Sequence, residues 1–211
     1  MQRLRITFAK TSAMQYTGHL DLHKTWERTL RRARLPLAYS EGFNPHPKIQ
    51  LGAALPLGFT SECELVDVWL ETPQDLGAAR AALEHSIPPG IVLADLQDIP
   101  LPAPAVQMLV TAAEYRVVVP PSIDAHTLDE RLVAMLAAPE IKRTRREKDY
   151  DLRPLIEALE HSASDEHGHV LVMRLAAREG ATGRPEEVVD VLGWPRTSAA
   201  YHRQKLFLRT A

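Results

Sequence analysis

The spacing of apolar residues changes along the first part of the chain, and this change restricts the fold more than any other feature. Residues 3–10 alternate apolar with polar or basic side chains, and a period of two is typical of a strand with one buried face. Residues 19–35 place apolar side chains, Trp26 and Leu30 among them, at steps of four or three. That spacing predicts an amphipathic helix, and Pro36 ends it because the residue before a proline avoids helical geometry.

The same alternation of strand and helix continues along the chain and then repeats. After the helix, the pattern predicts strands at 48–54, 61–71 and 90–99 and a helix at 74–87. Prolines then gather in residues 100–110, as in a stiff spacer. A similar order follows, with strands at 114–119, 169–177 and 205–209 and helices at 123–137 and 184–192. We therefore expect an α+β protein of two tandem ferredoxin-like (split βαβ) domains with antiparallel sheets, at 1–99 and 111–211, joined by a linker at 100–110.

Composition narrows the classes of function. The formal net charge is -2 and hydrophobic residues make up 45% of the chain, the balance of a folded protein without bulk attraction to nucleic acid or membrane. The single cysteine, Cys63, excludes an internal disulfide and a cysteine-rich metal or iron–sulfur site. No apolar run approaches a membrane span, and the first residues do not resemble a signal peptide. We expect a cytoplasmic protein that holds no metal or cofactor and does not contact a membrane.

Positive charge is nevertheless concentrated in the first fifty residues. The stretch 1–50 carries nine Lys or Arg residues against three acids. Guanidinium and ammonium groups bind phosphate oxygens, so an uneven cluster of this kind favours an RNA-binding surface. The basic residues that we expect to hold phosphates are Arg3, Arg5, Lys24, Arg28, Arg31, Arg32 and Lys48. The simpler interpretation of the helical arginines is a solvated face with local ion pairs.

The loop at 40–48 holds an unusual mixture of side chains. A structural turn needs the residue types found at Gly42, Pro45 and Pro47, but it does not need Ser40 and Glu41 as well. The same loop carries side chains suited to ligand contact. Phe43 can stack on a base, Asn44 and His46 can contact a nucleotide, and His46 can also transfer protons near neutral pH.

Two further features are open to a plainer interpretation. His19 and His23 have a spacing seen at metal sites, but no third ligand is evident, so we predict no metal there. His161, His167 and His169 are most simply a solvated loop. Residues 141–149 include five basic residues in a polar segment, which we interpret as a hairpin or a basic arm.

One long motif carries a family resemblance. It runs from Phe8 through the Gly18–Leu22 stretch and the helical arginines to the Tyr39–Lys48 segment, and it continues through Leu55–Gly58. This run resembles the bacterial radical SAM-linked protein family, whose members are fused to, or encoded beside, a radical SAM protein. The resemblance implies a partner that carries the iron–sulfur cluster, and His23 departs from the family pattern.

Three hypotheses follow from these observations. The first is an accessory RNA-binding module that acts with a radical SAM enzyme on tRNA or rRNA. The second is a metal-independent endoribonuclease in which His46 or His19 transfers the proton and nearby arginines stabilise the charged phosphate. The third is a protein adaptor that docks the radical SAM partner through the loop and does not contact RNA.

Overall fold

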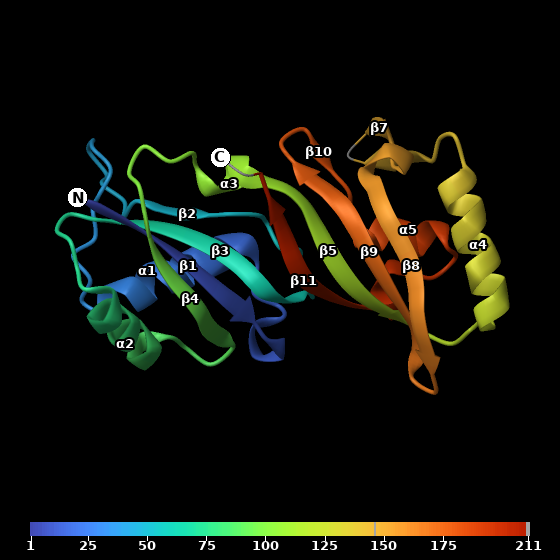
Figure 1. Ribbon diagram of the computed structural model, residues 1–211, viewed down its shortest axis with the longest axis horizontal. Coiled ribbons are helices and arrows are strands. Elements are labelled where there is room, and N and C mark those ends of the chain that lie inside the picture. Colours follow the sequence, from blue (N-terminus) through green and yellow to red (C-terminus); the bar gives the residue numbers. More distant parts are fainter. Residues whose placement is uncertain (146, 210–211) are drawn as a thin grey trace. The chain divides into compact units, whose positions relative to one another are not determined.

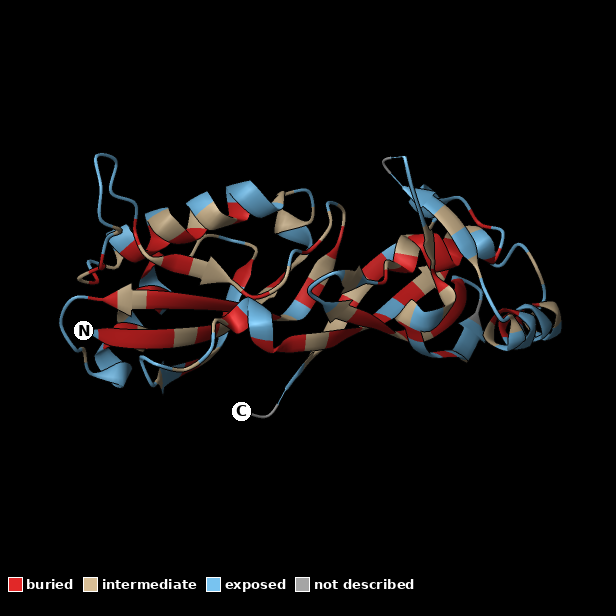
Figure 2. Cartoon of the chain, turned by 90° about the horizontal axis from the view of Figure 1, so that it is seen from above, coloured by how far each residue is buried: buried red, intermediate tan, exposed pale blue. Residues whose placement is uncertain are grey.

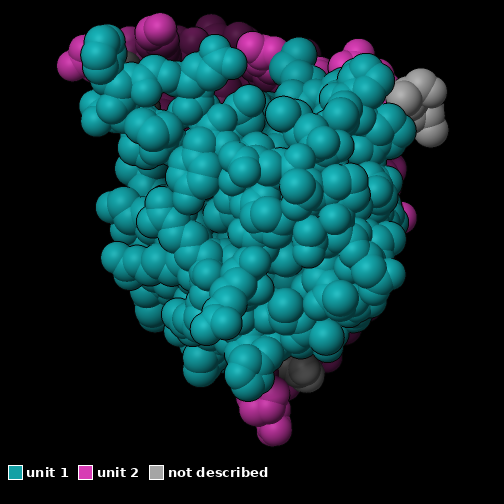
Figure 3. Space-filling view, turned by 90° about the vertical axis from the view of Figure 1, so that its left-hand side faces the viewer, with its two compact units in different colours: residues 1–110 teal, residues 111–211 magenta. Residues whose placement is uncertain are grey.

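The chain divides into two compact units. A computed structural model describes residues 1–145 and 147–209, and the units are Met1–Val110 and Thr111–Ala211 (Figure 3). Each unit combines helices with antiparallel strands, so the predicted α+β class is confirmed. Among the described residues, no helix is both long enough and apolar enough to cross a membrane.

Unit 1 has the element order βαββαβ, followed by a short helix. Its sheet places β2, β3, β1 and β4 side by side, and each of these neighbouring pairs is antiparallel (Figure 1). The elements are β1 (Gln2–Lys10), a short 3-10 turn (Ser12–Met14), α1 (His19–Arg32), β2 (Ile49–Leu51), β3 (Thr60–Leu70), α2 (Leu76–Ser86), β4 (Ile91–Ile99) and α3 (Val106–Leu109).

One face of this sheet forms the core of unit 1. Leu4, Ile6 and Phe8 of β1 are completely buried, and they share one cluster with the apolar side chains of α1 and α2. Trp26 of α1 is also completely buried, and its ring meets that of Phe8 edge to face with centroids 4.8 Å apart. Burying a side chain of this size stabilises the fold by about 1.5–3 kcal/mol. Figure 2 shows the buried and less buried positions alternating along the strands.

The proline-containing segment 100–110 belongs to unit 1 and is packed against its sheet. Val106 of α3 is completely buried, and the carbonyl groups of Ala103 and Pro104 accept hydrogen bonds from the guanidinium of Arg3. The sheet face that carries Arg3 is the face opposite the core. The segment therefore covers part of that face and is not a free spacer.

Unit 2 has a related element order with one inserted hairpin. Strand β9 pairs with β5 and with β8, its last residues pair with β10, and β5 lies next to β11. Strands β6 and β7 form a separate two-stranded hairpin. The elements are β5 (Val110–Val119), α4 (Ala125–Ala137), β6 (Lys142–Arg145), β7 (Lys148–Asp151), a 3-10 turn (Arg153–Leu155), β8 (Ile156–Asp165), β9 (Gly168–Arg178), β10 (Ala181–Thr182), α5 (Pro185–Val191), a 3-10 turn (Arg196–Ser198) and β11 (Ala200–Leu208).

Two of the three histidines expected in a solvated loop, His161 and His169, lie in strands, so that interpretation is wrong for them, whereas His167 lies in an exposed turn. His161 lies in β8, and His169 lies in β9 and is buried. The Oγ atom of Ser164 lies 2.7 Å from Nε2 of His161 and 2.7 Å from Nδ1 of His169. Nδ1 of His161 lies 2.8 Å from Asp129 of α4. The histidines therefore connect α4 to the sheet.

An ionic cluster attaches the β6–β7 hairpin to α5. Arg143 of β6 pairs with Glu187 at 2.7 Å and also with Asp190, and Arg196 pairs with Glu187 at 2.9 Å. Glu187 is buried, so its two arginine partners balance a charge that has little access to water. The hydrogen bond from Arg143 lowers the pKa of Asp190. The hairpin is thus fixed to the body of unit 2 by charge.

We expect the contribution of this cluster to depend on pH. The folded-state pKa of Asp190 lies below its unfolded value, so its stabilisation is present above the unfolded pKa and is lost as the pH falls through the folded pKa. We expect Arg143→Gln to lower the free energy of unfolding by about 1 kcal/mol at neutral pH, since solvent screens the partly exposed Asp190 and the buried Glu187 keeps Arg196 as a partner. In acid, we expect a smaller difference in the free energy of unfolding between the variant and the wild type.

The measurement is urea unfolding of both proteins at neutral pH and at about pH 3, below the usual pKa of a carboxyl group. Arg178→Gln, which removes a partly exposed arginine that pairs with Glu157, is the control and should have little effect at either pH. An effect of Arg143→Gln that is equal at the two pH values would contradict the prediction.

Candidate nucleic-acid interface

Helix α1 presents a cationic face to solvent. Its buried residues, Trp26 and Leu30 among them, face the core, and the opposite side carries exposed basic side chains. We call this set the cationic face, and its members are Lys24, Arg28, Arg31 and Arg32. Arg31 and Arg32 also lie in the last turn, where the helix dipole favours positive charge.

Three of these four side chains have partners within unit 1. Lys24 lies 4.0 Å from Asp21 and Arg31 lies 2.9 Å from Glu27, both as exposed or partly exposed pairs. Arg32 donates a hydrogen bond to the carbonyl of Ser86 at the end of α2. For Arg28 the described part of the chain offers no ion pair. Exposed pairs are weak, so Lys24 and Arg28 are the cations most available to a ligand.

The start of the loop is tied to the helix. A hydrogen bond with the Tyr39 side chain raises the pKa of Arg31. Arg31 therefore stays charged while it links α1 to the segment that enters the loop. This contact places the loop beside the C-terminal half of the cationic face.

The 40–48 loop is closed by two hydrogen bonds between Ser40 and His46. The N–H of Ser40 donates to the carbonyl of His46 at 2.8 Å, and the N–H of His46 donates to Oγ of Ser40 at 3.0 Å. Below this closure, the N–H of Lys48 donates to the carbonyl of Ala38. Gly42 has a φ of 119°, a conformation that glycine adopts far more readily than other residues. The polar side chain of Ser40 thus acts in closing the loop.

The closed loop projects its tip into solvent. Glu41, Gly42, Phe43, Asn44, Pro45 and His46 are all exposed, and Pro47 is buried. The ring of Phe43 is fully exposed. An aromatic ring held away from the protein on a fixed loop is a suitable platform for stacking on a nucleobase.

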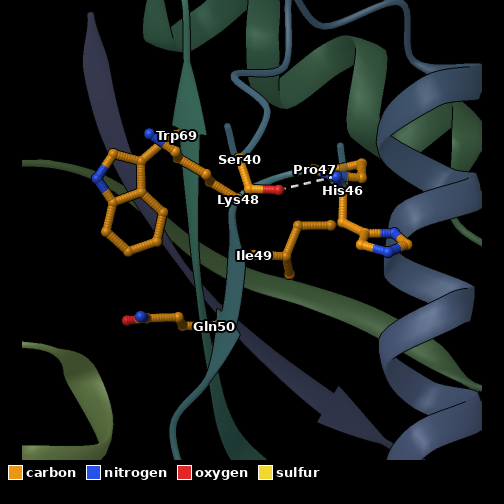
Figure 4. A pocket seen from close by; sticks show the side chains of 7 residues that line it. All are labelled: Ser40, His46, Pro47, Lys48, Ile49, Gln50 and Trp69. Carbon is orange, nitrogen blue, oxygen red and sulfur yellow. Dashed lines mark hydrogen bonds between the residues drawn. The ribbon is translucent and has the colours of Figure 1, made fainter. Parts of the chain in front are cut away.

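A pocket lies where the loop returns to the edge strand β2. It has a volume of about 320 Å³ and is lined by Ser40, His46, Pro47, Lys48, Ile49, Gln50 and Trp69. In Figure 4, the Trp69 and Gln50 side chains lie on one side of β2, and the His46 ring lies on the other side, toward a helix. The Oε1 atom of Gln50 is buried, and the described part of the chain offers it no hydrogen-bond partner. We call this the edge pocket, and it combines an aromatic ring, an ammonium group and a free amide oxygen.

Arg3 and Arg5 are not available to bind phosphate, contrary to the expectation from the sequence, because both pair with the buried Asp67. Arg3 is buried. Its Nε and Nη2 atoms donate hydrogen bonds to the carboxylate of Asp67, at 3.1 and 2.6 Å. Arg5 donates to Asp67 at 2.8 and 2.9 Å and is almost covered. The guanidinium of Arg3 also stacks over Trp69, 4.8 Å from the ring centroid. These two arginines therefore hold the sheet together and position Trp69.

The two histidines suggested for proton transfer differ in their surroundings. Partial desolvation and the nearby His23 lower the pKa of His19, and Glu64 acts in the opposite direction. In the described chain, the ring nitrogens of His46 form no hydrogen bond or ion pair. A general base needs a partner that orients its ring, so His46 lacks one feature of a catalytic histidine. Within the described residues, no group of three or more His, Cys, Asp or Glu side chains is arranged to hold a metal ion.

Sequence reasoning missed two residues that shape the edge pocket. Trp69 and Gln50 were not singled out, although Trp69 shares a strand face with Asp67 in the predicted strand at 61–71. Register joins them to the basic residues, because Arg3 lies opposite Trp69 and Arg5 lies opposite Asp67. The sequence did contain a signal for Trp69. It lies two positions from Asp67, on the polar face of the strand predicted at 61–71.

The fold of the chain is similar to that of a chain in a solved Cbf5–Nop10–Gar1 complex. It matches a chain of a Cbf5–Nop10–Gar1 complex with 11% identity and a TM-score of 0.52, covering 96% of this chain and 48% of that one. It also matches a chain of an H/ACA RNP bound to a substrate RNA (10% identity, TM-score 0.45, 88% of this chain, 43% of that one). A chain of an archaeal box H/ACA Nop10–Cbf5 complex gives 12% identity and a TM-score of 0.42, with the same coverage.

The chain spans less than half the length of these solved chains. No curated protein matches the sequence. A family model, described as an uncharacterized protein conserved in bacteria, matches residues 3–185, which is most of the chain. The chain therefore belongs to the bacterial family DUF2344.

Proposed function

We propose that this protein is an accessory RNA-binding module that binds single-stranded RNA across α1 and the 40–48 loop of unit 1. Lys24, Arg28 and Lys48 hold phosphates, Phe43 stacks on a base, and Asn44 contacts the nucleotide. Arg31 and Arg32 add positive charge while they fix the loop and α2. The fully exposed Phe43 on a backbone-closed loop beside a cationic helix is the observation that carries this proposal.

We further propose that both units are ferredoxin-like. In unit 1 the sheet order β2-β3-β1-β4 follows from a βαββαβ chain, and in unit 2 the strands β8, β9, β5 and β11 follow the same order if the hairpin is set aside. In RNA-binding proteins of this architecture, exposed aromatic rings stack on bases.

The radical SAM partner is proposed from the sequence resemblance alone. The resemblance implies a neighbouring protein that carries an iron–sulfur cluster, and this chain has one cysteine. In this role the module holds tRNA or rRNA while the partner modifies it. We favour binding over cleavage because the described residues leave the His46 ring without an orienting partner.

The proposal predicts RNA binding that weakens with salt. Contacts to about three phosphates of a single strand should weaken binding roughly 10- to 30-fold between about 50 and about 200 mM salt. A titration of the purified protein against bacterial small RNA at the two salt concentrations measures this. The triple variant Lys24→Ala, Arg28→Ala, Lys48→Ala should bind weakly and show a shallower dependence on salt.

Two matched variants separate the parts of the surface. Phe43→Ala should weaken binding about tenfold and leave the salt dependence unchanged, since stacking involves no counterion release. Arg80→Ala removes a partly exposed arginine from α2, where it pairs with Glu84, and should bind as the wild type does. Affinity that is indifferent to salt, or equal in the triple variant and the wild type, would refute the proposal. Loss of a radical SAM complex in Phe43→Ala without any RNA binding would instead support the adaptor hypothesis.

A further inference from the structure

Unit 2 contains a second pocket, which shares no residue with the surface described above. It lies among the β6–β7 hairpin, the 3-10 turn that follows it, and the segment from β10 to the start of α5, and its volume is about 480 Å³. We call it the hairpin pocket. Its lining residues are Arg145, Lys148, Tyr150, Asp151, Leu155, Gly180, Ala181, Thr182 and Arg184. The pocket is therefore lined by three cationic side chains and one carboxylate.

The cations from the hairpin share one face of it. Arg145 is paired in register with Lys148, and Arg143 with Tyr150. Side chains two residues apart on a strand lie on the same face, so Arg145 lies on the same face of the hairpin as Arg143, which contacts α5. Lys148 lies on that face too, because it is the cross-strand partner of Arg145. Within the described chain, Arg145 and Lys148 have no ion-pair partner. Arg146, in the same basic segment, lies outside the described residues.

The third cation of the hairpin pocket, Arg184, comes from the segment directly before α5. Its Nε atom is buried and has no hydrogen-bond partner among the described residues, and its ion pair with Glu186 is long, at 3.9 Å. A buried guanidinium N–H without an acceptor is costly, and a bound anion would remove that cost. This orphaned donor is a second observation, independent of the count of charges, that points to a ligand.

The remaining polar groups of the pocket suit an anion. Oδ1 of Asp151 already accepts the N–H groups of Ile141 and Arg153, at 2.8 and 2.9 Å, so its charge is held by the backbone. Burial, followed by the charge of Glu187, raises the pKa of Tyr150. Its hydroxyl therefore stays protonated at neutral pH and can donate. The hydroxyl of Thr182 makes a long hydrogen bond to the carbonyl of Arg178, at 3.5 Å, and can exchange it for a bond to a ligand.

We propose that the hairpin pocket binds a phosphate group through Arg145, Lys148 and Arg184. A phosphate carries up to two negative charges and several acceptor oxygens, which match three cations and two hydroxyl donors better than a carboxylate does. The phosphate can belong to a small phosphorylated ligand or to an RNA backbone, and both present the same oxygens. The ionic cluster around Arg143 fixes the hairpin in the position that this site needs.

Calorimetric titration of the full chain tests the site with three probes. These are inorganic phosphate, a 5′-phosphorylated mononucleotide, and a short single-stranded RNA without a terminal phosphate. Saturable binding of the first two assigns the pocket to a terminal phosphate, and binding of the third alone assigns it to a backbone phosphodiester. Either result supports the proposal, provided that the variants below respond as expected.

Two variants each remove one cation of the pocket, and a third removes a hairpin cation that does not line it. Lys148→Gln and Arg184→Gln should each weaken binding about tenfold or more, the loss expected for one charge-assisted hydrogen bond. Lys142→Gln is the matched control, because Lys142 pairs with Glu140 and does not line the pocket. Should Arg184→Gln unfold, Lys148→Gln alone decides, since Lys148 is exposed and has no partner to lose among the described residues.

The proposal is overturned if none of the probes binds saturably, or if Lys148→Gln and Lys142→Gln weaken binding equally. The triple variant of unit 1 should leave binding of inorganic phosphate unchanged. The test therefore fails or succeeds independently of RNA binding by unit 1.

Discussion

Asp67→Asn is expected to destabilise unit 1 by about 3–5 kcal/mol, the loss seen when one partner of a buried ion pair is removed. The carboxylate of Asp67 is completely buried and accepts hydrogen bonds from two guanidinium groups, those of Arg3 and Arg5. An asparagine of the same shape keeps one acceptor oxygen but loses the charge. Two cations, one of them fully buried, would then lie beside each other without a counterion.

The measurement is urea unfolding followed by tryptophan fluorescence, because Trp26 and Trp69 both lie in unit 1. Glu27→Gln is the control: it also removes an acid that pairs with an arginine, but Arg31 is exposed and the expected loss is below about 1 kcal/mol. If the two variants lose equal stability, Asp67 is not the counterion that holds this sheet face. Because Arg3 also stacks on Trp69, the Asp67→Asn variant should in addition disturb the edge pocket.

The Asp67 cluster also marks the limit of what the sequence could predict. The period of two in residues 3–10 correctly separated a buried face, with Leu4, from a polar face, with Arg5. It could not say what covers the polar face, because the partner of Arg5 lies 62 residues away and the carbonyls that bind Arg3 lie in the proline segment. A strand pattern gives the direction of a side chain, whereas its partner depends on the register between strands.

The α+β class and most helices were predictable because their signals are local. Helix α1 ends close to Pro36, as expected, and the loop at 40–48 lies where its prolines and Gly42 predict a loop. Strand β8 was missed because residues 156–165 mix acidic, small and histidine residues without a clear period. Its pairing with the strongly apolar β9 supplies the stabilisation that its own sequence does not indicate.

The candidate site was predictable in its position and only partly in its members. The cationic face and the loop were named from the sequence, and the geometry brings them together through Arg31 and Tyr39. Trp69 and Gln50 join the edge pocket by sheet register, which no local pattern reports. The hairpin pocket of unit 2 combines Lys148 with Arg184, two residues that a spacing rule has no reason to connect.

Gly168→Ala is expected to destabilise unit 2 by about 3 kcal/mol or more. Gly168 begins strand β9, next to the turn that follows β8, and its φ is 145°. A methyl group at this position would lie 2.1 Å from the carbonyl oxygen of Val119. That oxygen is part of the backbone of β5, so it cannot rotate away as a flexible side chain would. Steric overlap costs about 1–3 kcal/mol and the unfavourable φ costs a similar amount, and here both apply.

Gly180→Ala is the matched control, since Gly180 follows the other end of the same strand. Its φ is also positive, at 74°, but no atom of the described residues lies within 4 Å of the position that a methyl group would take. It should lose only about 1 kcal/mol, the backbone cost alone. Thermal and urea unfolding of both variants measure the difference. A loss in Gly168→Ala no greater than in Gly180→Ala would mean that β9 can shift away from Val119. In that case the sheet of unit 2 would be more tolerant than its register with β5 indicates.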